Sequence, residues 1–127
     1  MKLPKPTESE LAILQVLWAE GPSNVRTIHE VLSAHRDIGY TTALKLMQIM
    51  HEKGLLSRKK DGKTHVYTPT VSKEITQNQL LDKLVDSAFQ GSSMKLIMQA
   101  LGNHKTTSDE LTQIKSFIEK LEGGQNE

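Results

Sequence analysis

The chain has 127 residues, of which 36% are hydrophobic and 24% charged, values typical of a globular protein of one or two small domains. It contains no cysteine, which excludes disulfides, thiolate metal sites and cysteine catalysis. Its first residues lack the apolar stretch of a signal peptide, and no run reaches the ~18 apolar residues of a membrane span. We therefore expect a cytoplasmic protein.

Basic charge is concentrated in the first part of the sequence. Residues 1–72 carry ten Lys/Arg and seven Asp/Glu, a net charge of +3, whereas residues 73–127 carry six and eight, a net charge of −2. Five of the cations lie within eleven positions, opposed there only by Asp61: Lys53, Arg58, Lys59, Lys60 and Lys63. This distribution is typical of a DNA-binding domain joined to a second module.

Three helices are predicted before residue 54. The segment Thr7–Glu10 has the pattern of a capping box and opens a first helix that Gly21-Pro22 ends. Ser23 is expected to cap the second helix. The third helix runs from Tyr40 to about Lys53, with Ala43, Met47 and Met50 facing inward, and Gly54 is expected to supply a left-handed C-cap.

A β-hairpin is predicted next. The strands are Leu55–Lys60 and His65–Thr68, the Asp61-Gly62 pair favours a tight turn between them, and Pro69 ends the second strand. Three helices followed by a basic hairpin is the order of a winged helix. The expected fold class is mainly α with a small β-hairpin wing, and residues 1–72 form the DNA-binding domain.

Helical spacing returns from Val71 onward and defines the second predicted region, residues 73–127. Its expected parts are a helix of about four turns ending near Phe89, a short helix at Met94–Leu101, a loop at Gly102–Thr106, a helix that the Thr107–Glu110 capping box opens, and a frayed tail at Gly123–Gln125.

The apolar faces of this second region exceed what about 55 residues can bury within themselves, so we expect a helical dimerisation region. The alternative is that these helices fold back on the winged helix of the same monomer. The residues assigned to dimerisation are Leu80, Leu81, Leu84, Val85, Leu96, Ile97, Leu101, Ile114, Phe117 and Ile118.

Two sets of side chains are candidates for DNA contact. In a helix-turn-helix the second helix enters the major groove, and its outward residues here are Thr41, Thr42, Lys45, Gln48, Ile49 and Glu52. All of these except Glu52 are assigned to DNA contact, and Tyr40 could reach a phosphate. The hairpin adds Arg58, Lys59, Lys60, Lys63, Thr64 and His65 for the phosphate backbone. The alternatives are an ordinary solvated helix face and lysines that protect an edge strand from aggregation.

Patterns for other chemistry are missing from the sequence. None of the five histidines forms a pair at metal-ligand spacing with a carboxylate helper, and there is no Gly-rich phosphate loop, nucleophile elbow or isolated acid pair. We therefore expect no metal, no cofactor and no enzymatic activity.

The sequence resembles the penicillinase repressor family (the BlaI/MecI/CopY group). The segments that carry the resemblance are Pro6–Leu11, Val16–Trp18, Gly21-Pro22, Gly39–Thr42, Glu52–Leu56 and Gly62–Pro69. The resemblance implies a homodimeric transcriptional repressor that binds a palindromic operator near its own and neighbouring genes. It also implies a membrane-bound sensor peptidase as a partner and a link to antibiotic resistance.

The resemblance further implies that Lys95–Leu101 contains the stretch that such a peptidase cleaves. Gln99-Ala100 stands where the β-lactam-responsive members have Asn-Phe, so the cleavage site departs from their pattern. The copper-responsive branch uses a cysteine-rich C-terminal metal site, which this sequence excludes. Two other functions remain as alternatives: a small-molecule-gated regulator of the same fold and a winged-helix module for protein–protein contact.

Overall fold

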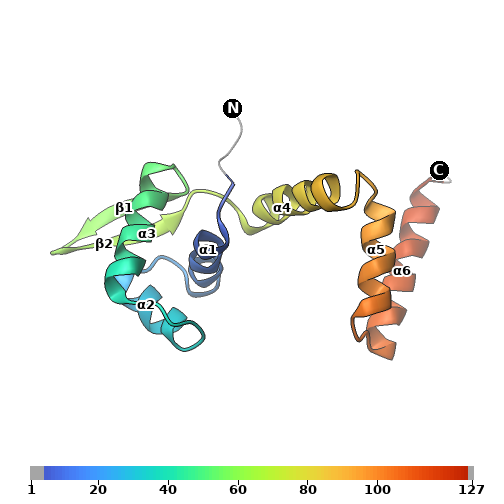
Figure 1. Cartoon of the computed structure of the whole chain (residues 1–127), viewed down its shortest axis with the longest axis horizontal. Helices are drawn as coiled ribbons and strands as arrows, with labels where there is room; N and C mark the ends of the chain where they lie inside the picture. The colour runs from blue at the N-terminus through green and yellow to red at the C-terminus, as the bar shows by residue number, and fades with distance from the viewer. Residues whose placement is uncertain (1–4, 126–127) are drawn as a thin grey trace. The chain divides into compact units, whose positions relative to one another are not determined.

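The computed structural model describes residues 5–125, so both predicted domain ranges extend slightly beyond it. The chain contains six helices and one antiparallel hairpin in these residues (Figure 1). The elements are α1 (Glu8–Glu20), α2 (Val25–Ser33), α3 (Tyr40–Glu52), β1 (Leu56–Asp61), β2 (Thr64–Pro69), α4 (Lys73–Ala88), α5 (Ser93–Asn103) and α6 (Ser108–Gln125). This order confirms the predicted winged helix with a following helical region.

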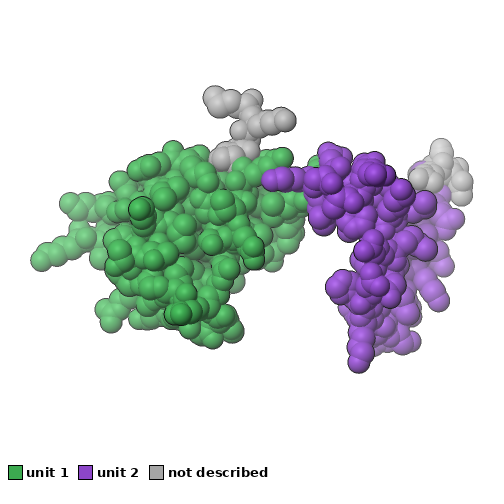
Figure 2. Space-filling model, viewed as in Figure 1, with its two compact units in different colours: residues 1–82 green, residues 83–127 purple. Residues whose placement is uncertain are grey.

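The chain divides into two compact units between Asp82 and Lys83, inside α4 (Figure 2). This division falls later than the predicted boundary at residues 72 and 73, because the start of α4 is tied to the first unit. Thr76 in the first turns of α4 is buried. The Trp18 indole Nε1 donates to the carbonyl oxygen of Val71 at 3.1 Å, just before this helix. The first unit therefore includes the start of α4.

The core of the first unit lies between α1, α2, α3 and the base of the hairpin. Ala43, Met47 and Met50 of α3 are fully buried, which confirms the predicted inward face of this helix. Ile13, Leu14 and Ile28, among others, pack against them from α1 and α2. One face of α3 is thereby fixed to the core, and the opposite face is left at the surface.

The starts of α1 and α2 show one confirmed and one wrong prediction. The capping box of α1 is present: the Glu10 backbone N–H donates to Thr7 Oγ1 at 3.2 Å, and the Thr7 N–H donates to the Glu10 carboxylate at 2.9 Å. The prediction that Ser23 caps α2 is wrong, because Asn24 Oδ1 accepts from the Thr27 N–H at 2.9 Å. The Ser23 backbone instead pairs with that of Tyr67, at 3.1 and 2.8 Å.

The hairpin pairs Leu56 with Pro69 at its base and Asp61 with Thr64 at its tip. Gly62 occupies the turn with a φ of +64°, a left-handed conformation that glycine adopts without the strain of a Cβ. The bridge between Ser23 and Tyr67 attaches the second strand to the segment before α2. The wing is consequently held to the helical core at its base.

Helices α5 and α6 extend beyond their predicted ends. The loop expected at Gly102–Thr106 is wrong in its first part, because α5 runs to Asn103 and the His104 N–H donates to the Ala100 carbonyl at 3.2 Å. The expected frayed tail at Gly123–Gln125 is also wrong, since α6 continues to Gln125. Glycine weakens a helix by about 1 kcal/mol without blocking its hydrogen bonds. Gly102 therefore does not end α5, and Gly123 and Gly124 do not end α6. The Thr107–Glu110 capping box is confirmed, with contacts of 3.0 and 3.1 Å.

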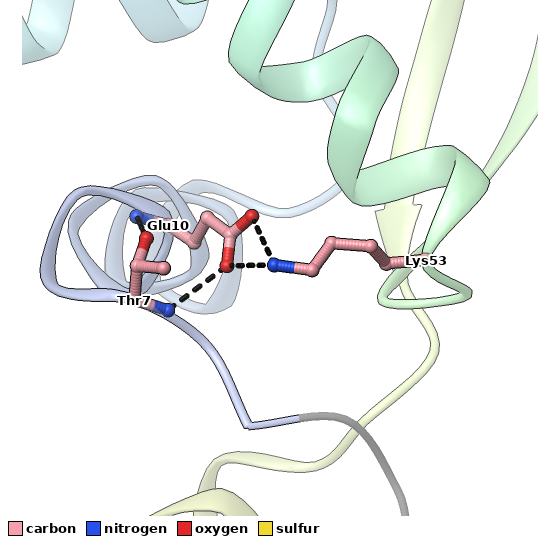
Figure 3. A network of polar contacts seen from close by, with 3 residues as sticks. All are labelled: Thr7, Glu10 and Lys53. Carbon is pink, nitrogen blue, oxygen red and sulfur yellow. Dashed lines mark hydrogen bonds and ion pairs between the residues drawn. The ribbon is translucent and has the colours of Figure 1, made fainter.

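An ion pair connects the start of α1 with the end of α3 (Figure 3). The Lys53 ammonium donates to both Glu10 carboxylate oxygens at 2.9 Å, and the Glu10 side chain is only 3% exposed. Burial acts to raise the pKa of Glu10, but the hydrogen bonds from Lys53 and Thr7 outweigh it and hold the pKa below its usual value. Lys53 thus has a structural role, and it is not counted among the basic residues available to bind DNA.

The substitution Glu10→Gln is expected to lower the free energy of unfolding by about 1.5 kcal/mol at pH 7, because Lys53 loses its counter-ion. The lowered carboxyl pKa means that the ionic contribution is present well above the usual pKa of 4.5. It is lost as the pH falls through the lowered value. Urea unfolding of both proteins at pH 7 and in acid tests this: the difference should shrink in acid.

The matched control is Glu8→Gln, which removes the same charge from an exposed position in the same helical turn. We expect it to change the free energy of unfolding by less than about 0.5 kcal/mol. A Glu10→Gln effect that stays constant down to acidic pH would contradict the ionic origin of the stabilisation.

Candidate nucleic-acid interface

The surface face of α3 carries all six of its predicted contact residues. The exposed side chains are Tyr40, Thr41, Thr42, Lys45, Gln48 and Ile49. Tyr40 is the first helical residue and is 47% exposed. Gly39, the N-cap, is extended and offers no side-chain acceptor to the first turn. This face therefore combines short hydroxyls, an amide and a cation on a helix whose other side is anchored in the core.

A hollow of about 630 Å³ lies between the start of α2, the face of α3 and the hairpin. The hairpin follows α3 and lies beside it in the fold (Figure 1). The residues that line the hollow are Asn24, Val25, Arg26, Tyr40, Leu44, Gln48, Arg58, Lys63, Thr64, His65 and Tyr67. This set, which we call the basic groove, contains three cations and no carboxylate. The net positive charge of these residues attracts an anionic chain such as a phosphate backbone.

The hairpin separates its predicted contact residues into two groups. Arg58 pairs with Tyr67 across the strands, and both line the basic groove. Side chains alternate along a strand, so Lys59 points to the opposite face. Lys59 and Lys60 line a second hollow of about 430 Å³, whose other lining residues include Asp61 and Val66. The structure therefore places Arg58, Lys63, Thr64 and His65 beside α3 and Lys59 on the opposite face of the hairpin. Lys60 pairs with His65 across the strands, but it lines the second hollow and not the basic groove.

The orientation of the wing is set by Tyr67. Its side chain is buried, and its backbone bonds to Ser23 fix β2 beside the start of α2. His65 is half-buried, and its ring centroid lies 6.3 Å from that of Tyr67. Arg58 and Lys63 are exposed on this anchored hairpin. Cations on an anchored support lose less conformational freedom when they bind an anion.

Five residues of the basic groove were outside the predicted set, and two of them, Asn24 and Arg26, carry polar side chains beside α3. Both belong to the start of α2, and Arg26 is exposed, with a 3.4 Å ion pair to Glu30 on the next turn. An exposed pair of this kind contributes only about 0.3–0.5 kcal/mol, so it holds the guanidinium weakly. The first helix of a helix-turn-helix crosses the DNA backbone, and that rule could have drawn attention to a cation at its start.

The ten residues predicted for dimerisation lie on α4, α5 and α6, and none of them is buried. Four are half-buried: Leu80, Val85, Leu96 and Ile114. The other six are exposed: Leu81, Leu84, Ile97, Leu101, Phe117 and Ile118. Met94, Met98, Leu111 and Leu121 are also exposed on these helices and were outside the predicted set. Helices α5 and α6 contain no buried residue among those described.

The part of the chain that the structure describes contains no group of three His, Asp or Glu side chains placed to hold a metal ion. Within the same residues, no helix combines the length and the apolar character needed to cross a membrane.

The model of the family described as penicillinase repressor matches residues 6–120. The chain belongs to the penicillinase repressor family. Members of this family are transcriptional repressors, so the chain is a DNA-binding regulator and not an enzyme. The family resemblance seen in the sequence is thereby confirmed.

Several relatives of this repressor are similar over most of their length. The transcriptional regulator BlaI of Mycobacterium tuberculosis is 29% identical over 97% of this chain and 89% of that protein. The penicillinase repressor of Bacillus licheniformis is 21% identical over 94% of this chain and 93% of that protein. The solution structure of monomeric Bacillus licheniformis BlaI in complex with the blaP half-operator covers 57% of this chain and 89% of that one, with 26% identity and a TM-score of 0.51.

Proposed function

We propose that this repressor binds a palindromic operator as a homodimer, with α3 in the major groove and the wing on the phosphate backbone. The observation that carries the proposal is the basic groove, which joins Tyr40, Leu44 and Gln48 of α3 to Arg58 and Lys63 of the wing and contains no carboxylate among its lining residues. A winged-helix module for protein–protein contact predicts a neutral or acidic surface here instead. The similar BlaI structure was solved in complex with a half-operator, which supports DNA binding rather than protein–protein contact.

Sequence recognition is assigned to the outward residues of α3. Thr41, Thr42, Lys45 and Gln48 carry the hydroxyl, ammonium and amide groups that hydrogen-bond to base edges or phosphates. Their helix is about the width that the major groove of B-DNA admits. The wing cations add affinity that depends on salt and carries little sequence information.

The homodimer is proposed because the C-terminal helices expose apolar side chains on a scale that a monomer rarely shows. Phe117, Ile118 and Leu121 of α6 are each about half exposed or more, as are Ile97 and Met98 of α5. A second copy of the chain would cover these faces and place two DNA-binding units on two half-sites. The residues assigned to this contact are those predicted from the sequence, together with Met94, Met98, Leu111 and Leu121.

We further propose that proteolysis relieves repression, with a membrane sensor peptidase as the partner of a cytoplasmic repressor. Gln99 and Ala100 are exposed, but both lie within α5, and the Ala100 carbonyl is bonded to the His104 N–H. Cleavage between them requires α5 to unfold locally first. Incubation with such a peptidase, followed by mass analysis, tests this step, and an uncut Gln99–Ala100 bond would exclude it.

The substitution Lys45→Ala is expected to weaken binding to a specific duplex about tenfold and binding to a random duplex less than about threefold, because Lys45 is assigned to the major groove. The specific duplex is one that the wild-type protein selects from a randomised library. Gel-shift titrations of both duplexes measure the effect. Lys73→Ala, a change of equal charge at an exposed residue of α4 and not of α3, serves as the control. Equal losses on both duplexes would show that Lys45 contacts only phosphate.

A further inference from the structure

One histidine connects α2 with the start of α3. His29 is half-buried in α2, and its Nε2 lies 2.9 Å from the carbonyl oxygen of Ile38. A carbonyl oxygen only accepts, so this nitrogen carries the hydrogen in the contact. The His29 ring also meets the ring of Tyr40 edge to face, with centroids 5.8 Å apart and 83° between the planes. His29 therefore contacts the residues on both sides of Gly39.

The segment that His29 contacts sets the direction of α3. Gly39 starts this helix without a side-chain cap, so the first turn is held by fewer local contacts than the first turns of α1 and α2. Ile38 packs its side chain against the core, and its backbone is held by His29. Tyr40 lines the basic groove, whereas His29 does not. The contacts of His29 thus act on residues at the interface from a position outside it.

We propose that His29 is a positioning residue for DNA recognition, a role that rests on the proposed function. Its hydrogen bond to the Ile38 carbonyl fixes the approach of the chain to α3. Thr41 and Thr42 directly follow Tyr40 and are assigned to base contacts. Such contacts require the start of α3 to be held in a fixed position. If the start of α3 could shift, it would lose conformational freedom on binding the correct sequence, and the affinity for that sequence would fall. The affinity for random DNA would fall less, because base contacts contribute less to it.

The test compares His29→Phe with His29→Gln. Phenylalanine keeps a ring for the contact with Tyr40 but lacks the donor, whereas glutamine places a donor nitrogen close to the position of Nε2. We expect His29→Phe to bind the duplex selected by the wild-type protein about tenfold more weakly, with less than about a twofold change on a random duplex. His29→Gln should return to within about threefold of the wild type.

A second measurement separates positioning from folding and from phosphate contact. The dependence of affinity on salt should keep its slope in His29→Phe, because the phosphate contacts of the wing remain. His35→Phe changes an exposed histidine close to the end of α2 and is the matched control, with no expected loss. If His29→Phe fails to fold, His29→Asn replaces it, since its shorter side chain keeps polarity but does not reach the Ile38 carbonyl.

Each outcome of this comparison is informative. Selective loss in His29→Phe with recovery in His29→Gln supports the positioning role. Unchanged selectivity in a folded His29→Phe or His29→Asn variant, beside a wild type that does select DNA, overturns the positioning role alone. Loss that glutamine does not recover overturns it as well, because the donor would then be irrelevant. A wild-type protein that selects no duplex overturns both the proposed function and this inference.

Discussion

Phe117→Asp is expected to convert the repressor into a monomer and to weaken its binding to a palindromic duplex about a hundredfold, equivalent to ~2.7 kcal/mol. Phe117 is 62% exposed on α6, and an aromatic side chain at the centre of an interface often contributes 2 kcal/mol or more. A carboxylate at this position would have to be buried without a partner for the dimer to form. Sedimentation and gel-shift titrations measure both effects.

The control for this change is Ser116→Asp, which introduces the same charge at the neighbouring exposed position of α6. A duplex with only one half-site provides a second control, because a monomer and a dimer should bind it with similar affinity per DNA-binding unit. The proposed dimer contact would be wrong if Phe117→Asp remained dimeric. It would also be wrong if the monomeric variant bound the palindrome as tightly as the wild type.

The double substitution Arg58→Ala with Lys63→Ala is expected to weaken binding to a half-site duplex about thirtyfold, or ~2 kcal/mol. Both cations line the basic groove, where no carboxylate offsets their charge. Each lost phosphate contact lowers the slope of log affinity against log salt by about 0.9, so the slope should fall by about 1.8 in magnitude. Titrations at several salt concentrations provide the measurement.

The hairpin offers a matched comparison in Lys59→Ala with Lys60→Ala, which removes the same charge from the same hairpin. Both lysines line the hollow that contains Asp61, and neither lines the basic groove. We expect them to change affinity less than about fivefold, through the general field of the protein. Equal effects of the two double variants would mean that DNA contacts both faces of the wing.

The sequence predicted the elements whose signals are local. Capping boxes at Thr7 and Thr107 and a tight hairpin turn each depend on residues within a few positions, and all are present. The two turn residues are Gly62 and Lys63 rather than the predicted Asp61 and Gly62, because Asp61 belongs to the first strand and pairs with Thr64. The inward face of α3 followed from helical spacing alone. These features could be predicted because the physical partners are neighbours in the chain.

The features that the sequence did not predict depend on partners far apart in the chain. Ser23 was expected to cap α2, but its backbone is engaged by Tyr67, and Asn24 takes the cap. Lys53 was predicted to belong to the basic cluster, but its ammonium group pairs with the buried Glu10 carboxylate. Alternation along a strand predicts that Arg58 and Lys59 point in opposite directions, but only the packing of the hairpin on α3 shows which of them faces the groove.

The long-range contacts of the first unit also set the order in which it can form during synthesis. Glu10 bonds to a lysine 43 residues later, and Trp18 donates to a carbonyl 53 residues later. At about 5–20 residues per second, a ribosome needs roughly 3–10 s to make the chain between Trp18 and Val71. During that interval α1 has been synthesised, but its apolar face lacks its full set of partners. The nascent repressor thus acquires a complete DNA-binding unit only after its second strand has left the ribosome.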